Sequence, residues 1–208
     1  MTQKQQASRR TRADGEQSRE RILDAATQIA AERGYEGTSI GAVSKKCGLP
    51  ASSIYWHFKD KDDLIAAVIE RSFVRWLTAW QTPPDGDPEE RVVALAVGAA
   101  KALQESPDFI RLGLMLALER RPVEPRARAM YLDARDQAYR QLVEELRKSL
   151  PELAEADLLQ LATYALAGAD GLFIAKEIGG DAVDLVGLFE THARSIYHAA
   201  RRLGETRT

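Results

Sequence analysis

Residues 34–64 carry the pattern that most limits how this chain can fold, because two short helical stretches meet there at a glycine. Thr38 or Ser39 can cap the first stretch. The helical spacing gives it three inward residues, Ile40, Val43 and Cys47. Gly48 supplies the turn, and the second stretch starts near Pro50, a residue that the first turn of a helix accepts. This pattern predicts a helix-turn-helix.

The second stretch has an unusual outer face. Its buried positions, at i, i+3 and i+7, are Ala51, Ile54 and Phe58, which places five polar or aromatic residues outside or at the edge: Ser52, Ser53, Tyr55, Trp56 and His57. A soluble protein gains little by exposing such groups on a two-turn helix unless something docks there. A helix in the major groove of DNA presents its first side chains to base edges while its neighbours hold phosphates. We therefore expect double-stranded DNA as the partner of this face.

Each side chain on this face suits part of that task. Ser52 and Ser53 are short hydrogen-bonding groups near the helix start, where bases would lie. Tyr55 and His57 can donate to phosphate oxygens, and lysines at 59 and 61 supply positive charge. Trp56 can contact a thymine methyl group or a sugar edge. The alternative is that Tyr55 and Trp56 pack against the following helix as ordinary core residues.

A first helix is expected over residues 18–34, capped by Ser18 and ended by Gly34. One buried stripe runs along it, formed by Ile22, Ala25, Ala26, Ile29 and Ala30. Residues 1–17 have almost no large apolar side chain and contain Arg9, Arg10 and Arg12. They are expected to form a disordered basic arm, which either reaches the minor groove or is simply a solvated tail.

Charge is distributed unevenly along the chain. Residues 1–61 carry eleven Lys or Arg against seven Asp or Glu, a net charge of +4, whereas the remainder has a net charge of −6. Chance variation in surface charge is an alternative explanation. Together with the helix-turn-helix pattern, however, the distribution indicates that only the front of the chain meets a polyanion.

Residues 18–66 resemble the N-terminal part of the tetracycline-repressor (TetR-like) family. The resemblance rests on an unbroken spacing of Gly34, Tyr35, Thr38, Ser39, Gly48, Ile54, Tyr55, His57, Phe58, Lys61 and Leu64. It implies backbone contacts from Thr38, Tyr55, His57 and Lys61, and base reading by Ser52, Ser53 and Trp56. Ser39, in the same motif, is included in the predicted DNA-binding set.

Three residues depart from the family pattern. Gly41 stands where many relatives have an Arg, and Pro50 and Ala51 replace a common polar pair. The second stretch therefore has no arginine to read guanine by a bidentate contact. Specificity is expected to depend on hydroxyl groups, aromatic rings and DNA shape.

The rest of the chain is expected to be helical, so the fold class is all-α. A loop at 82–88, rich in Pro, Asp and Gly, ends a helix over 61–80. Further helices are expected at 89–105, 107–120, 125–149, 156–178 and 182–203. The predicted domains are a helix-turn-helix DNA-binding domain over 18–62 and a helical effector-binding and dimerisation domain over 63–208.

Two of these helices are too apolar to be buried on one side only. Residues 109–118 and 158–175 each carry a single charge, Arg111 and Asp170 respectively. Such helices must be covered by a partner subunit, a ligand or both; a tightly packed monomer is the alternative. By resemblance, the last two long helices form a homodimer. Close approach would be allowed by the small residues Ala165, Ala167, Gly168, Ala169 and Gly171.

The resemblance also implies a small, largely apolar effector. The candidate pocket residues are Trp80, Phe109, Arg111, Met115, Tyr131, Tyr139, Tyr164, Asp170 and Phe173. Aromatic residues at helical spacing are more often plain core, so this alternative stays open for each of them. Arg111 and Asp170 need partners if they are buried, and structural pairing is favoured over ligand binding.

No enzyme motif is recognisable, and no catalytic residue, cofactor or metal site is expected. The three histidines are scattered, and the single cysteine excludes an internal disulfide. Uninterrupted apolar runs, 92–100 and 112–118 being the longest, fall short of the ~20 residues of a membrane span. The expectation is a cytoplasmic, homodimeric repressor that a small molecule releases from a palindromic operator. The alternative is a constitutive DNA-binding factor without an effector.

Overall fold

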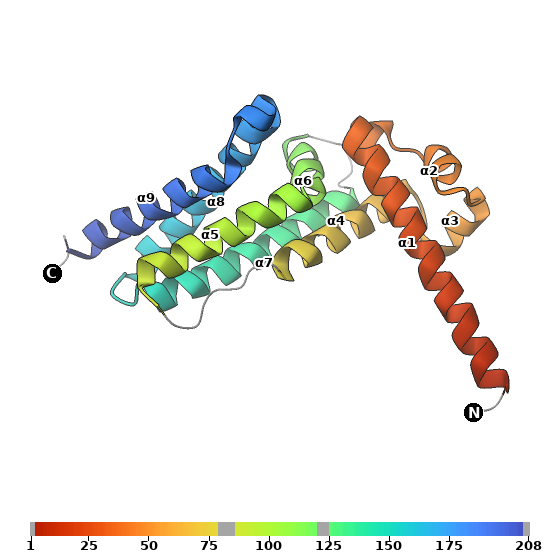
Figure 1. Ribbon diagram of the computed structural model, residues 1–208, viewed down its shortest axis with the longest axis horizontal. Coiled ribbons are helices and arrows are strands. Elements are labelled where there is room, and N and C mark those ends of the chain that lie inside the picture. Colours follow the sequence, from red (N-terminus) through yellow and green to blue (C-terminus); the bar gives the residue numbers. More distant parts are fainter. Residues whose placement is uncertain (1–2, 79–85, 120–124, 206–208) are drawn as a thin grey trace. The chain divides into compact units, whose positions relative to one another are not determined.

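The computed structural model describes residues 3–78, 86–119 and 125–205, and their side chains from residue 13 to residue 204. Within these ranges the secondary structure is helical (Figure 1), which confirms the all-α fold class. Packing divides the chain into two compact units, Met1–Phe73 with Asp108–Leu132, and Val74–Pro107 with Asp133–Thr208. The first unit thus extends beyond residue 62, where the sequence placed the end of the DNA-binding domain.

The first helix is longer than the sequence indicated. Helix α1 spans Gln3–Gly37, with a break at Gly34, whose φ of 70° lies in the left-handed region that suits glycine. The expected start at Ser18 is wrong, because the Ser18 hydroxyl donates to the carbonyl of Asp14, 2.8 Å away, inside the helix. The backbone over 3–17 is therefore helical rather than disordered, while the side chains of Arg9, Arg10 and Arg12 lie outside the described residues.

Helices α2 and α3 form the expected helix-turn-helix. Helix α2, Ile40–Cys47, begins at Ser39, whose Oγ accepts from the amide of Ala42 at 3.2 Å. It ends at Gly48, which has a φ of 69° and donates its amide proton to Ser44. Helix α3 spans Ala51–His57, with Pro50 in extended backbone directly before it. Pro50 is therefore the cap and not, as expected, a residue of the first turn.

Side chains of α4 fix the start of this helix and its position on α1. Helix α4 spans Lys61–Thr78. Asp60 accepts from the amide of Asp63 at 2.9 Å, and the Asp63 carboxylate accepts from the amide of Lys59 at 3.0 Å. This reciprocal arrangement resembles a capping box. Further along, Arg71 reaches α1 and donates to a set of three side chains: Glu20 at 2.9 Å, Asp24 at 2.8 Å and Thr27 at 3.0 Å.

Helices α6 and α7 complete the first unit. Helix α6 spans Asp108–Leu118 and packs on α1, and α7 spans Arg126–Ser149. The carboxylate of Asp62 accepts from the first amides of α7 and from the hydroxyl of Tyr35, which lies 3.0 Å away. A carboxylate is stabilised at the amide end of a helix. Asp62 therefore links α4, α7 and the end of α1.

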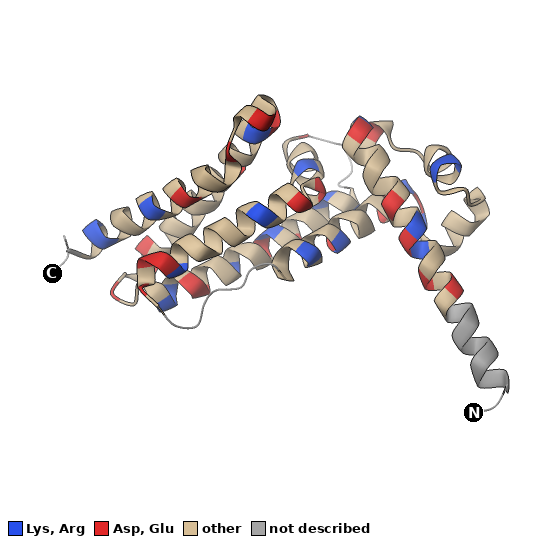
Figure 2. Cartoon of the chain, in the orientation of Figure 1, with Lys and Arg blue, Asp and Glu red and all other residues tan. Residues whose placement is uncertain are grey.

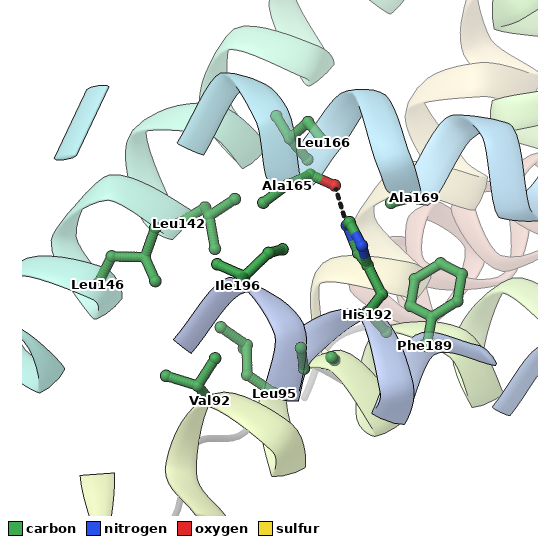
Figure 3. Close-up of a pocket in the computed structure, with 13 residues that line it drawn as sticks. Val92, Leu95, Leu142, Leu146, Ala165, Leu166, Ala169, Phe189, His192 and Ile196 are labelled. Atoms are coloured by element: carbon green, nitrogen blue, oxygen red, sulfur yellow. Dashed lines mark hydrogen bonds between the residues drawn. The ribbon is translucent and has the colours of Figure 1, made fainter. Parts of the chain in front are cut away.

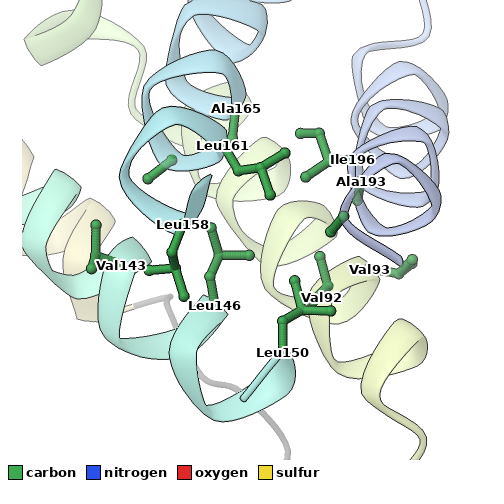
Figure 4. Packing of buried hydrophobic residues seen from close by; sticks show 12 residues of the cluster. Val92, Val93, Val143, Leu146, Leu150, Leu158, Leu161, Ala165, Ala193 and Ile196 are labelled. Atoms are coloured by element: carbon green, nitrogen blue, oxygen red, sulfur yellow. The ribbon is translucent and has the colours of Figure 1, made fainter. Parts of the chain in front are cut away.

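The second unit is built from α5, α8, α9 and most of α7. Its helices are α5 (Pro88–Glu105), α8 (Glu155–Gly179), a short 3-10 turn (Gly180–Ala182) and α9 (Leu185–Glu205). Helix α9 packs along both α5 and α8. Between the four helices lies a cluster of aliphatic side chains (Figure 4), including Val92, Leu146, Leu150, Leu158, Leu161 and Ile196.

Helix α8 is only partly covered by its own chain. Tyr164, Ala167, Gly171, Ile174 and Ile178 recur every three or four residues along it, and all five are exposed, Ile178 to 83%. Among the described residues, 155–182 form one stretch long and apolar enough to cross a membrane by length and composition. Counting uninterrupted apolar runs overlooked this stretch, because charged residues interrupt it.

Candidate DNA-binding site

Helix α3 presents the aromatic face that the sequence predicted. Tyr55 is 57% exposed and Trp56 is 76% exposed, whereas Ile54 and Phe58 on the opposite side are buried. Ser52 is exposed, and Ser53 and His57 are partly exposed. The alternative in which Tyr55 and Trp56 are core residues is therefore wrong. The apolar side of α3 holds the helix in place and leaves the polar and aromatic side open.

Trp56 and His57 support each other at the end of α3. Their rings meet edge to face, with centroids 4.5 Å apart. Burial lowers the pKa of His57 from its ordinary value, and the nearby charge of Arg19 lowers it further. A lowered pKa favours the neutral imidazole near pH 7, which still has one N–H to donate to a phosphate oxygen.

The early part of α1 lies next to this face, which the sequence did not indicate. A Cβ atom built on Gly15 would lie 3.7 Å from the ring of Trp56. Arg19, one turn further along, has its guanidinium 5.5 Å from the centre of the Phe58 ring. Helix α1 therefore brings a cation and a close backbone contact to the end of α3.

The hydroxyl of Thr38 already has a partner within the protein. Its side chain is buried, and its hydroxyl donates to the carbonyl of Gly34 at 2.9 Å. This bond satisfies a carbonyl that the break at Gly34 leaves without a helical partner. Thr38 therefore helps to fix the end of α1, and its contact with a phosphate stays a prediction. Ser39 is exposed, and its hydroxyl accepts a bond from Ala42, so its own proton remains available to a phosphate.

Lys61 is already engaged within the protein. Its ammonium group lies 4.3 Å from the centre of the Tyr35 ring, 3.3 Å from the Tyr35 carbonyl and 3.5 Å from a carboxylate oxygen of Glu36. These contacts join the start of α4 to the end of α1. Lys59 is exposed, and so are Lys45 and Lys46 in the last turn of α2, where Lys46 donates to Glu32 at 3.2 Å. Figure 2 marks the Lys and Arg positions along the ribbon. The sequence predicted the charge of Lys61 but not its structural contacts.

The predicted effector residues do not form one pocket. Trp80 lies outside the described residues. Phe109, Arg111, Met115 and Tyr131 belong to the first unit, and Tyr139, Tyr164, Asp170 and Phe173 belong to the second. Phe109, Tyr131 and Phe173 are buried core residues, while Met115 and Tyr164 are exposed. The alternative of ordinary core is therefore correct for the three buried rings.

Asp170 has a structural partner, in agreement with the structural pairing favoured from the sequence. Both of its oxygens accept from the guanidinium of Arg135 on α7, in a bidentate ion pair. Burial raises the pKa of Asp170 above its ordinary value, and the hydrogen bond and charge of Arg135 act in the opposite direction. This pair ties α7 to α8.

A cavity does occur in the second unit, between α5, α7, α8 and α9 (Figure 3). Its volume is about 70 Å³. The thirteen lining residues are Val92, Leu95, Ala96, Ala99, Leu142, Leu146, Ala165, Leu166, Ala169, Phe189, His192, Ala193 and Ile196. Apart from Ala165 and Ala169, which were singled out for helix packing, this set was not recognised in the sequence. In the sequence, these residues cannot be told from ordinary core residues, because only the packing of the four helices brings them around one cavity.

Residues 22–68 match the family model described as bacterial regulatory proteins, tetR family. The HTH-type transcriptional regulator AcrR of Shigella flexneri is 38% identical over 65 residues, which cover 31% of this chain and 30% of that protein. The HTH-type transcriptional repressor KstR of Rhodococcus jostii is 30% identical over 89 residues, covering 43% of this chain and 42% of that protein. The chain thus spans less than half the length of these curated relatives.

A solved structure is similar over nearly the whole chain. A transcriptional regulator of the TerR/AcrR family from Aquifex aeolicus superposes with a TM-score of 0.68 at 23% identity. The match covers 88% of this chain and 99% of that one, and at this identity it shows the fold. The fold and the exposed face of α3 define this chain as a helix-turn-helix protein. Its N-terminal part is similar to the tetR family, both by the family model over residues 22–68 and by the curated relatives.

Proposed function

We propose that this protein is a sequence-specific DNA-binding regulator of transcription, and most simply a repressor. The observation that carries the proposal is the exposed polar and aromatic face of α3, held by a buried apolar side. A helix in the major groove makes base contacts with its first residues, and these are Ser52 and Ser53. Tyr55, His57 and Ser39 would then contact phosphates, with Lys59 and Lys61 supplying charge. The name of KstR supports repression over activation.

The proposed active form is a homodimer joined through α8 and α9. The exposed apolar stripe of α8 needs a cover, and a second copy of the same stripe is self-complementary about a two-fold axis. Gly171 lies at its centre, and a Cβ built there would meet nothing within 4 Å, so another helix can approach closely. A second copy is a better cover than lipid, because Asp170 and Lys176 lie within the same helix.

Release from DNA by a small molecule is the third part of the proposal. An effector lowers operator affinity if it binds better to a dimer whose two α3 helices are wrongly spaced. The effect cannot exceed that difference in affinity, commonly about 1–3 kcal/mol. Support comes from the cavity in the second unit. A structural neighbour from Saccharomonospora viridis, described as a putative transcriptional regulator in complex with choline, shows that this fold accommodates a small molecule.

The DNA-binding proposal can be tested by a gel shift with DNA from upstream of the gene itself. We expect a complex that unlabelled specific DNA removes and unrelated DNA does not. Tyr55→Phe removes one hydroxyl and keeps the ring, so it should weaken binding to all sequences by a similar factor, about five- to tenfold for one lost hydrogen bond. Tyr139→Phe is the matched control, because it removes one hydroxyl from a partly exposed tyrosine on α7, outside both α3 and the exposed stripe of α8. If the two variants bound DNA equally well, Tyr55 would have no role in contacting phosphates.

A further inference from the structure

The cavity between α5, α7, α8 and α9 has a chemical character that limits what it can bind. Twelve of its thirteen lining residues are aliphatic or aromatic, and His192 is the one with a polar side chain. No carboxylate, ammonium or guanidinium group lies among these residues. A charged ligand group would therefore lose its hydration without gaining a partner. The cavity selects against ions and favours hydrocarbon.

His192 fixes how α8 and α9 meet at this cavity. Its Nε2 lies 3.0 Å from the carbonyl oxygen of Ala165 (Figure 3), and since a carbonyl can only accept, Nε2 carries the proton. A Cβ built on Gly168 would lie 2.2 Å from the imidazole ring, so the ring packs directly on the backbone of α8 there. In this tautomer Nδ1 is an acceptor, and its partner must be a donor.

The lining residues of the cavity differ in how deeply they are buried. Five of them are partly exposed and mark the opening: Ala96, Leu142, Leu166, Ala169 and His192. The other eight are buried. The one polar side chain of the cavity, that of His192, therefore lies among its partly exposed residues, and all eight buried residues are apolar. A molecule that matches this order has a hydrocarbon tail and one polar end.

The volume of the cavity limits the length of the ligand's hydrocarbon tail. The cavity volume of about 70 Å³ is roughly half of the ~150 Å³ known to hold benzene. Alanine at five lining positions, 96, 99, 165, 169 and 193, leaves this space. A short unbranched chain fits this volume better than a ring or a branched skeleton.

We propose that this cavity is the effector site, and that its ligand is an uncharged, mainly hydrocarbon molecule with one hydroxyl group that donates to His192. This inference rests on the proposed function, since an effector is part of that function. It replaces the aromatic residues predicted from the sequence with a set of alanines, leucines and one histidine. The site is lined by α8 and α9, the helices of the proposed dimer, so a ligand that separates them would alter the dimer.

Calorimetry with the full-length protein tests the assignment, without DNA. The probes are 1-butanol to 1-octanol, together with hexanoate, hexylammonium and 1-methoxypentane, an ether with as many heavy atoms as 1-hexanol. Affinity for the alcohols should rise about fourfold per added methylene until the tail fills the cavity. Hexanoate and hexylammonium should bind much more weakly than 1-hexanol, and the ether about five- to tenfold more weakly. Equal or tighter binding of either ion, or equal binding of ether and alcohol, would overturn the ligand class.

Three variants separate the site from general effects on folding. Ala169→Leu fills the mouth and should abolish alcohol binding, whereas Ala129→Leu, the same change at an exposed position on α7, should leave it intact. His192→Phe keeps a ring over Gly168 but removes the acceptor, so the preference for alcohol over ether should disappear. Loss of binding in Ala129→Leu, or unchanged binding in Ala169→Leu, would place the ligand elsewhere.

Failure of this inference can be told apart from failure of the proposed function. No saturable binding of any alcohol, with the gel shift intact, would show that the cavity is only a packing defect and leave the DNA-binding proposal standing. If alcohols bound in the cavity but left operator affinity unchanged, the cavity would be a ligand site. Release from DNA by a ligand bound there would then be contradicted.

Discussion

At the scale of single residues, two side chains of the predicted DNA-binding set hold the protein together. The hydroxyl of Thr38 is used to close the break at Gly34. The ammonium of Lys61 lies between the Tyr35 ring, the Tyr35 carbonyl and Glu36. A phosphate approaching Lys61 would compete with Glu36. If Lys61 contacts a phosphate, as proposed, it does so from a position that its contacts with Tyr35 and Glu36 already fix.

This dual role predicts different effects for two neighbouring lysines. Lys61→Ala should weaken binding to all sequences and make the dependence of log affinity on log salt shallower by about one unit. It should also lower the free energy of unfolding by about 1 kcal/mol, because the contact with Tyr35 is lost. Lys59→Ala should affect DNA binding alone, since Lys59 is exposed.

Salt-dependent binding curves and urea denaturation of both variants check this prediction. An unchanged salt slope in Lys61→Ala would contradict its contact with phosphate. An unchanged free energy of unfolding would contradict its structural role.

At the scale of elements, the helices differ in how completely their own chain covers them. Helix α3 is amphipathic in an unusual sense, since one side is buried core and the other is aromatic and exposed. Helix α8 has no such separation, and its apolar residues continue around to the exposed face. Lone exposed apolar residues are common on proteins. A regular stripe of them along one helix marks an interface.

The stripe on α8 predicts the effect of a charge at its centre. Gly171→Arg should convert the dimer to a monomer, because two guanidinium groups would meet across the two-fold axis. The monomer itself should tolerate the change, since the site is open and Arg favours a helix over Gly by roughly 1 kcal/mol. Sedimentation velocity at micromolar concentration measures the assembly state.

Circular dichroism shows whether the helices of the Gly171→Arg variant are intact. Ala129→Arg is the control at an exposed position of α7. If Gly171→Arg remained a dimer, the second copy would have to bind elsewhere.

At the scale of the whole molecule, two compact units share long helices. Helices α4 and α7 each pass from one unit into the other. In a dimer, each copy supplies one α3, and the separation of the two α3 helices sets the spacing of the half-sites. For two helices in successive major grooves this spacing is about 34 Å, or one turn of DNA.

The proposed dimer predicts a strong dependence on operator spacing. Inserting about five base pairs between the half-sites rotates one of them by roughly half a turn, which moves it to the opposite face of the duplex. Affinity should then fall to that of a single half-site. Changing the sequence of the spacer without changing its length serves as the control, because both half-sites then keep their separation and stay on one face. A gel shift that showed equal affinity for the original and the five-base-pair variant would rule out simultaneous binding of both half-sites.

The sequence by itself determined the helix-turn-helix, because its signals are local. Ser39 and Gly48 fix the ends of α2 through bonds within a few residues, and the spacing of Ile54 and Phe58 decides which side of α3 is exposed. Local signals did not place the start of α1, because residues 1–17 have almost no large apolar side chain and therefore no periodic apolar pattern.

Only the tertiary structure decided which residues surround a cavity and which polar groups are already in use. The cavity is formed by aliphatic residues of four helices, separated by up to a hundred positions, and its shape depends on how these helices pack. The hydroxyl of Thr38 and the ammonium of Lys61 are used by carbonyls at the end of α1, which become available only where that helix breaks. Side-chain packing and the competition of polar groups for hydrogen-bond partners act between segments that are far apart in the sequence. The spacing of residues within one segment therefore does not predict them.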